Sequence, residues 1–487
     1  MTALARPAPR LKGSVAARGG ALVSGALVLA ALSLLRPYAL AFDPMAWAVW
    51  GREVGRLALD TTSGPSWKPF PVLFTTPLAL FGDATPALWL IIARAGGLLA
   101  LAGAFALGSR LGGRWAGAAA AAVMALSPWW AFNTALGNSE GLLAASVTWA
   151  VVAHLDGRRR GALGLLTAAS LMRPEVWPFL LGYGVWMWRR DAGDHRVILL
   201  AGALVPVLWF GPDLVGAGGA IASSKTARGI PSPGSAKLAD IPALALLGDT
   251  ATLFTLPALL AALLAAVLGG RTVRWLAAGV VGWVMMVALM TTAGYAGNPR
   301  YLVAATAVGA ALAGVGAVRA ASEVSRFGRG SRDETDAAAV PGQTPSGAGP
   351  GRASRLAAPI GAAVLVAAVL ALTAGDLRTQ FRELDSRAAA AGAFDSALSQ
   401  AGGAAALQRC ARIRTSTRAR SLVAWRLDLP LRDLDARPVR PAVLIRAKWF
   451  YGQGLEPARE PGYRTLVSTP YWEFVASCGR APQVERP

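Results

Sequence analysis

The chain has 487 residues, of which 54% are apolar, only 15% are charged and 17 are tryptophan. Long apolar runs recur along most of its length, which a single soluble core does not require and a multi-pass membrane protein does. The formal charge of +21 does not indicate nucleic-acid binding, because the basic residues lie in short gaps between apolar runs rather than on one folded soluble domain. Placed at alternate gaps, these residues predict cytoplasmic loops by the positive-inside rule.

The N-terminal segments predict a membrane anchor followed by an interfacial helix. Residues 1–18 are basic and are expected to form a disordered cytoplasmic tail. The first apolar run lacks a clean small-residue cleavage site after it, so we expect a retained signal anchor. In residues 46–59, Trp47 and Trp50 share one helical face and charged residues share the other. This pattern predicts a helix in the interface plane, within an outer loop at 43–70.

The middle of the chain predicts a membrane core at 19–318. Its apolar runs, with one later run, are enough for roughly ten to twelve spans. The runs at 162–171 and 176–188 are separated by Arg173-Pro174-Glu175. Two short helices that meet at a polar break predict a cavity near membrane depth. Residues 211–240 are rich in Gly, Ser, Pro and Lys and predict a second outer loop.

The C-terminal third predicts a separate soluble domain. Residues 319–355 are rich in Gly, Ser, Pro and Arg, which is typical of a disordered linker, here on the cytoplasmic side. Residues 356–375 are expected to be the last transmembrane helix, and 376–487 a small extracytoplasmic α/β domain. Cys410 and Cys478 both lie in this domain. A pair on the outside predicts a disulfide, with two unpaired buried thiols as the alternative.

Several acidic residues are candidates for chemistry. Asp43 directly follows the first apolar run, and Glu140 and Glu175 fall in or near later outer gaps. Placing an ionised group at membrane depth costs about 3 kcal/mol or more, so each such residue is a functional hypothesis. Because Asp followed by Pro is also a good helix start, a capping role for Asp43 stands beside the catalytic one. Glu175 can equally form a structural ion pair with Arg173.

Basic residues in the same predicted outer gaps are candidates for binding an anion. Arg300 stands at the mouth of a span that returns inward, and a phosphate ligand suits it; snorkelling to lipid headgroups is the alternative. Lys68 lies between Trp67 and Pro69, which fix its position. The sequence has no Cys–His cluster or phosphate-binding glycine loop, so we expect no cofactor, and we predict no metal site although a divalent metal stays compatible.

The order of these motifs resembles that of the GT-C glycosyltransferases, polytopic enzymes that use polyprenyl-phosphate sugars. They include protein O-mannosyltransferases and the aminoarabinose transferases of lipid A. The resemblance covers about residues 20–320 and includes an acid in the first outer loop, a Lys-Pro block, a Phe-Gly turn, an Arg-led span and a basic residue before Tyr-Leu. The matching residues are Asp43, Trp67-Lys68-Pro69-Phe70-Pro71, Leu80-Phe81-Gly82-Asp83, Arg94, Gly108-Ser109-Arg110-Leu111-Gly112-Gly113 and Arg300-Tyr301-Leu302.

The chain departs from the family pattern at two places. Many members carry an Asp-Glu pair in the first loop, whereas Pro44 follows Asp43 here. The proline that the family has soon after Tyr-Leu is absent, because Val303 and Ala304 stand there. Because of the first departure, Asp43 lacks the neighbouring carboxylate that those members have.

The resemblance implies a mainly α, polytopic membrane helix bundle with a small C-terminal α/β domain. It implies inverting transfer of a sugar from a polyprenyl-phosphate donor to a glycan, lipid or protein acceptor of the cell envelope. Asp43 would be the general base, and Arg300 and then Lys68 would bind the donor phosphate. The other residues implied to bind substrate are Trp67, Glu140, Arg173, Glu175 and Tyr301.

The resemblance also implies a location and a sugar class. The enzyme would be a multi-pass protein of the cell membrane with a cytoplasmic N-terminus and its soluble domain outside. A composition rich in Ala, Gly and Arg is typical of actinobacteria, which implies a mannose or pentose donor. Two other interpretations stay open: a transporter of a lipid-linked envelope precursor, and a non-catalytic scaffold.

Overall fold

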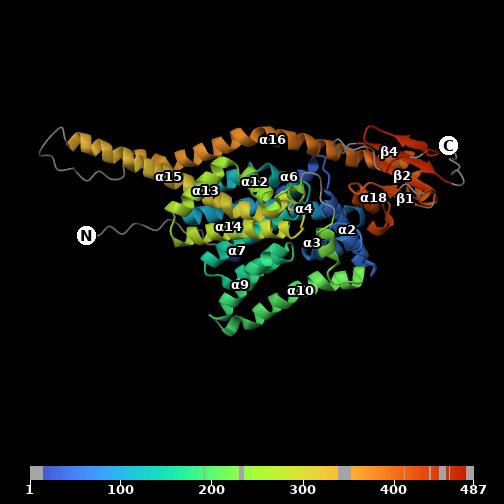
Figure 1. The fold of residues 1–487 in the computed structure, drawn as a ribbon, viewed down its shortest axis with the longest axis horizontal. Coiled ribbons are helices and arrows are strands. Elements are labelled where there is room, and N and C mark those ends of the chain that lie inside the picture. Colours follow the sequence, from blue (N-terminus) through green and yellow to red (C-terminus); the bar gives the residue numbers. More distant parts are fainter. Residues whose placement is uncertain are drawn as a thin grey trace.

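The computed structural model describes residues 15–190, 192–229, 235–337, 352–410, 412–437, 440–448, 457–459 and 461–478. The described chain is mainly helical, and its small sheet lies at one end of the bundle beside α18 and α2 (Figure 1). A membrane helix bundle with a small C-terminal α/β domain is therefore confirmed as the fold class.

The helices form one bundle followed by a mixed C-terminal region. The helices of the bundle are α1 (Val15–Leu32), α2 (Phe42–Gly55), α3 (Pro69–Leu78), α4 (Thr85–Gly112), α5 (Arg114–Ala125), α6 (Pro128–Ala135), α7 (Glu140–Leu155), α8 (Arg159–Ser170), α9 (Trp177–Trp188), α10 (His195–Ala217), α11 (Ala222–Ala227), α12 (Pro242–Phe254), α13 (Leu256–Leu268), α14 (Arg271–Thr292) and α15 (Val303–Ala337). The remaining elements are α16 (Arg352–Gln400), α17 (Gly403–Gln408), β1 (Ile413–Thr415), α18 (Arg420–Arg426), β2 (Ala442–Ala447), β3 (Arg464–Ser468) and β4 (Trp472–Ser477).

Within the described residues, six helices are long and apolar enough to cross a membrane, or up to eight if each of two bent pairs is one span. This is fewer than the ten to twelve spans expected from the sequence. The reason is that several apolar runs fold as helices of 12 to 16 residues, namely α7, α8 and α9. A helix needs about 20 residues to cross a bilayer, so apolar runs alone overestimate the number of spans.

The centre of the bundle is packed through small residues on α15. At Gly314 an added Cβ would meet the carbonyl of Ala116 on α5, and at Gly316 it would meet the carbonyl of Ala261 on α13. Such close backbone approach is typical of helix pairs in membranes, where small residues let dispersion contacts replace the hydrophobic effect. It places α15, which begins just after Arg300, at the centre of the bundle.

Helix α2 differs from the interfacial helix that its sequence pattern predicts. Nearly all of it is buried, including Trp47, Trp50 and Glu53. Its polar side does not face solvent, because one hydrophobic cluster extends from Trp50 to Trp425 and Leu431 of the C-terminal domain. The amphipathic pattern predicts that one face of the helix contacts apolar groups. In the structure the C-terminal domain also covers the other, charged face of α2.

Three further boundaries differ from the sequence predictions. The expected outer loop at 211–240 is partly helical, because α10 continues to Ala217 and α11 follows it. The expected linker at 319–355 begins as an extension of α15 to Ala337, and residues 338–351 lie outside the described residues. The expected last span at 356–375 is part of the 49-residue α16. Of the expected tail at 1–18, the part before α1 also lies outside the described residues.

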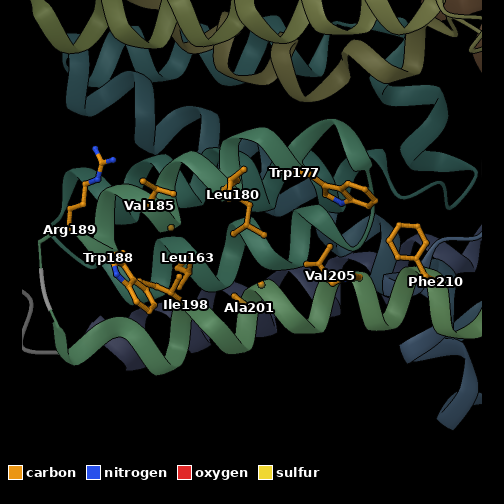
Figure 2. A pocket seen from close by; sticks show the side chains of 14 residues that line it. Leu163, Trp177, Leu180, Val185, Trp188, Arg189, Ile198, Ala201, Val205 and Phe210 are labelled. Carbon is orange, nitrogen blue, oxygen red and sulfur yellow. The ribbon is translucent and has the colours of Figure 1, made fainter. Parts of the chain in front are cut away.

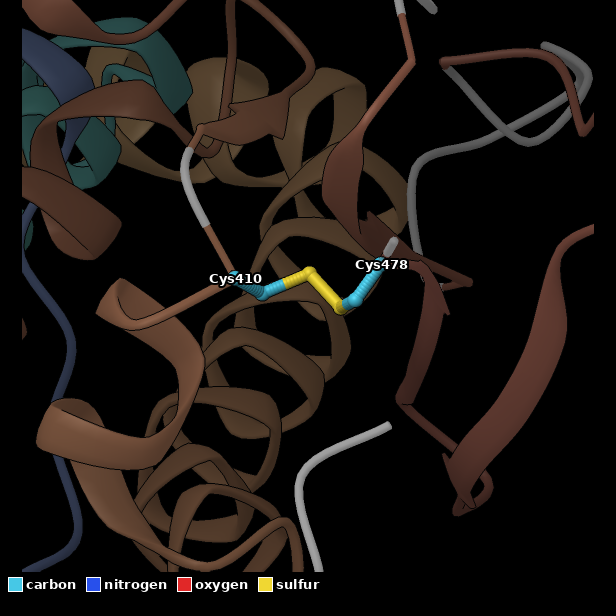
Figure 3. The surroundings of a disulfide bond; sticks show 2 residues. All are labelled: Cys410 and Cys478. Atoms are coloured by element: carbon cyan, nitrogen blue, oxygen red, sulfur yellow. A yellow bond between two sulfur atoms is a disulfide. The ribbon is translucent and has the colours of Figure 1, made fainter. Parts of the chain in front are cut away.

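The C-terminal domain is a four-stranded sheet in the order β1-β2-β4-β3, with β1 and β2 parallel and the other pairs antiparallel. The far end of α16 packs on it, since Trp472 donates its indole N–H to the carbonyl of Ala390 at 2.7 Å. A disulfide between Cys410 and Cys478 ties the segment before β1 to the residue after β4, with Cα atoms 5.4 Å apart (Figure 3).

Charged contacts hold this domain on α2. Arg56 makes a bidentate pair with Asp428, at 2.8 and 3.1 Å, and Arg52 lies 2.8 Å from the same carboxylate. Arg432 lies 2.7 Å from Asp60 in the loop after α2. The C-terminal domain is therefore attached to the same helix that carries Asp43 in its first turn.

Candidate active site

Asp43, Lys68 and Arg300 come from three separate chain segments that the fold brings together. Asp43 lies in the first turn of α2, and Lys68 is the extended residue before α3. Helix α3 is held against α2, because Thr75 donates its hydroxyl to the carbonyl of Trp47 at 2.7 Å. Arg300 follows Asn298, whose side chain caps a short 3-10 turn by accepting the Arg300 N–H at 3.1 Å.

The carboxylate of Asp43 lies between two cations. Arg300 Nη1 is 2.8 Å from Asp43 Oδ2, and Lys68 Nζ is 3.9 Å from the same oxygen. Asp43 is only 8% exposed and Lys68 3%. Charges this well buried interact strongly, because little water screens them. The structure thus joins one acid and two cations in one small volume.

A second buried ion pair lies beside the first. Arg173 Nη2 is 2.5 Å from Glu140 Oε1, and Glu140 is fully buried at 0% exposure. The Arg173 guanidinium also lies over the ring of Tyr301, 4.4 Å from its centroid. Glu175 is buried in the 3-10 turn between α8 and α9. The polar break in the sequence therefore does interrupt two short helices, as its pattern predicted.

The ammonium group of Lys68 is suited to an anion. It is buried and has no hydrogen-bond acceptor among the described residues, and it lies 5.1 Å from the centroid of the Trp47 ring. Burial, together with the nearby Arg173, lowers the pKa of Lys68 to about 7, although the charge of Glu140 opposes this shift. An anionic group of a ligand would supply the missing hydrogen bonds and favour the protonated form.

Two neighbouring pockets open onto this cluster. We call the first the cationic pocket; it has a volume of about 260 Å³, and Lys68, Arg173 and Glu175 line it. We call the second the polar chamber; it has a volume of about 490 Å³, and Asp43 and Arg300 line it. They share three lining residues, Ser66, Ala227 and Tyr301. The Asp43 carboxylate and the Lys68 ammonium thus line adjoining pockets.

An apolar groove of about 570 Å³ runs between α9 and α10 (Figure 2). At one end it is lined by Trp188 and Arg189, and at the other by Trp177 and Phe210. Trp177 and Phe210 also line the cationic pocket. The apolar groove and the cationic pocket therefore adjoin each other at these two side chains.

Not every residue selected from the sequence lines a pocket. Trp67 packs on Trp50 with ring centroids 5.4 Å apart and donates its N–H to the carbonyl of Leu208 at 3.0 Å. Sequence reasoning also missed two residues of the polar chamber, Trp129 and Asp249. Asp249 is an acid within an apolar run, which is a signal that the sequence does carry. Trp129 has no local signal that distinguishes it from other boundary tryptophans.

The described residues contain no group of three or more His, Cys, Asp or Glu side chains placed to hold a metal ion.

These features define a multi-pass membrane helix bundle with a small C-terminal α/β domain, the fold class that the resemblance to the GT-C family implied. The chain is similar in structure to ArnT from Cupriavidus metallidurans, both in the crystal structure bound to undecaprenyl phosphate and in the apo state. The first comparison has a TM-score of 0.54 at 15% identity, and the second 0.53 at 16%; each covers 96% of this chain and 100% of ArnT. At such low identity the likeness establishes a shared fold.

Comparisons at the level of sequence find no relative. No protein-family model matches the chain, and no curated protein matches it.

Proposed function

We propose that the chain is an integral membrane glycosyltransferase that takes a sugar, a mannose or a pentose, from a polyprenyl-phosphate donor. The acceptor belongs to the cell envelope, and transfer occurs on the extracytoplasmic face with the N-terminus in the cytoplasm. The observation that carries the proposal is the contact of one buried carboxylate, Asp43, with Arg300 and Lys68. This contact lies where the cationic pocket meets the polar chamber.

The donor has a charged headgroup and an apolar tail, and of the two adjoining cavities one is charged and the other apolar. Its phosphate would bind Lys68, whose ammonium group has no hydrogen-bond acceptor among the described residues, together with Arg300. Its polyprenyl tail would lie in the apolar groove between α9 and α10 (Figure 2). Trp177 and Phe210, which line both cavities, mark the junction of headgroup and tail. Undecaprenyl phosphate, bound by the ArnT structure of similar fold, has the same amphipathic character.

Asp43 would act as general base. It removes the proton from an acceptor hydroxyl while that oxygen forms a bond to the anomeric carbon. The bond from the anomeric carbon to the phosphate oxygen breaks at the same time, and polyprenyl phosphate leaves as an anion. Attack opposite the leaving group inverts the configuration. The leaving group needs positive charge rather than a protonated acid, which Arg300 and Lys68 supply.

The second ion pair has a positioning role in this proposal. Glu140 fixes Arg173, and Arg173 stacks on Tyr301, which both pockets share. Glu175 lines the cationic pocket and would accept hydrogen bonds from hydroxyls of the donor sugar. Trp67 would stabilise the site indirectly by packing on Trp50.

The test is sugar transfer by Asp43→Asn in membranes supplied with radiolabelled polyprenyl-phosphate mannose or arabinose. Loss of a general base is expected to lower the rate about 10²- to 10⁴-fold. Asp83→Asn is the matched control, because Asp83 is exposed in the turn after α3 and should retain parental activity. Equal transfer by Asp43→Asn and the parent would show that the base is assigned wrongly. Absence of transfer by the parent with either donor would favour a scaffold or a transporter.

A further inference from the structure

Part of the polar chamber is lined by residues that have no role in the proposed donor binding or catalysis. Part of its wall is built by α12, which contributes Asp249 and Thr252, and by the start of α6, which contributes Trp129. Asp43 and Arg300 line the same chamber. A molecule held there would therefore lie next to the proposed base.

Asp249 is a carboxylate with no hydrogen bond or ion pair to any described residue. It lies on α12, and α12 with α13 forms a bent pair that is apolar enough to cross a membrane. A carboxylate in such a segment costs about 3 kcal/mol, and residues of this kind mark substrate sites more often than structural ones. Among the described residues that line the chamber, Arg300 is the only cation, and it contacts Asp43. Asp249 is thus free to accept hydrogen bonds from a ligand.

Trp129 gives the chamber an aromatic surface. Its side chain lies in the first turn of α6 and is 37% exposed although it lines a cavity. An indole ring offers a flat apolar area for the C–H face of a sugar ring. A carboxylate accepts two hydroxyl donors at once, which suits vicinal hydroxyls. Ser66 and Thr226 add further hydroxyl groups to the lining.

We propose that the polar chamber binds a neutral carbohydrate acceptor, with Asp249 accepting hydrogen bonds from its hydroxyls and Trp129 packing on its ring. This proposal rests on the proposed function, and it assigns the acceptor to the sugar class. An anionic acceptor is disfavoured, because it would face Asp249, and the one cation among the described lining residues, Arg300, already contacts Asp43. The acceptor hydroxyl next to Asp43 is the one that receives the sugar.

The experiment uses the full chain in membranes that retain their own acceptors, with radiolabelled decaprenyl-phosphate mannose or arabinose as donor. Linkage analysis of the product should find the label on a sugar hydroxyl. With an extract of these acceptors titrated in, Asp249→Asn should raise the acceptor KM about 10- to 100-fold, as expected for lost hydrogen bonds to a charged group. The donor KM should stay unchanged.

Trp129→Ala should act in the same direction, with an acceptor KM raised about 5- to 10-fold for a lost aromatic contact. The matched controls are Asp240→Asn and Trp275→Ala, because both side chains are exposed and neither lines the chamber. Both controls should keep the parental acceptor KM. A Trp129→Ala variant whose donor KM also rises would indicate disturbed folding. The acceptor KM of Asp249→Asn then tests the proposal.

The outcomes separate this inference from the proposed function. Label attached through serine or threonine, or through a phosphate, would overturn the carbohydrate assignment while leaving the transferase intact. An unchanged acceptor KM in Asp249→Asn would overturn the role of that residue in the same way. If the parent transfers neither sugar, the proposed function fails, and the inference falls with it.

Discussion

Glu53 links the stability of the protein to pH in a way that one substitution can test. Its carboxyl group is 5% exposed on α2, and Oε2 accepts the Asp60 N–H at 3.1 Å while Oε1 has no partner in the described structure. Burial raises the pKa of Glu53 from 4.5 to about 7. Asp60, Arg52 and Arg432 are the charged groups next to it, and the two arginines limit this rise.

The direction in which stability changes with pH follows from proton binding by Glu53. The folded protein holds the Glu53 proton more tightly than the unfolded chain, so stability falls as the pH rises from about 4.5 to about 7 and is level above that. A shift of this size corresponds to at most about 3 kcal/mol. Because charge effects at buried sites are moderated by an effective dielectric constant of about 20, we expect about 1–2 kcal/mol.

Glu53→Gln removes the charge and keeps an oxygen for the Asp60 N–H. The variant should be more stable than the parent at pH 8 by about 1–2 kcal/mol and equally stable at pH 4.5. Thermal unfolding of the purified protein in detergent at both pH values measures this. Glu323→Gln is the control, because this carboxylate forms an exposed pair with Arg326 and should change stability by less than about 0.5 kcal/mol. A Glu53→Gln variant that is less stable at pH 8, or shifted equally at both pH values, would refute the reasoning.

Substitutions at Lys68, Gly314 and Cys410 should each have a measurable effect. The pKa of Lys68 is about 7, so its charge is lost as pH rises and the donor KM should increase up to about tenfold per pH unit above 7. Lys68→Arg, which keeps its charge, should flatten this profile; a flat parental profile would contradict the assignment. Gly314→Ala should destabilise the bundle by about 1–3 kcal/mol through overpacking, whereas Gly375→Ala, with open space around it, should not; thermal unfolding distinguishes them. Cys410→Ser should weaken the C-terminal domain by about 2–4 kcal/mol, seen as faster proteolysis of that domain, and unchanged proteolysis would argue against a stabilising disulfide.

The sequence by itself predicted the class of fold. Long apolar runs with basic gaps predict a membrane bundle whatever the packing, because the bilayer requires apolar helices of a given length. The same local signals selected Asp43, Lys68 and Arg300, since charged groups next to apolar runs are costly unless they have a role. The resemblance to the GT-C fold depended on the order of short motifs, and the comparison with ArnT confirms that fold.

Only the tertiary structure decided which of these residues meet. Asp43, Lys68 and Arg300 are far apart in the chain, and their distances depend on how α2, α3 and the turn before α15 pack together. The burial of α2 by the C-terminal domain was not predictable from its amphipathic pattern, because that pattern records the polarity of a surface and not the partner that covers it. Asp249 likewise lines the polar chamber beside residues that are far from it in the chain, such as Asp43 and Trp129. Local sequence determines helices and their polarity, whereas sites between helices arise from contacts over long chain separations.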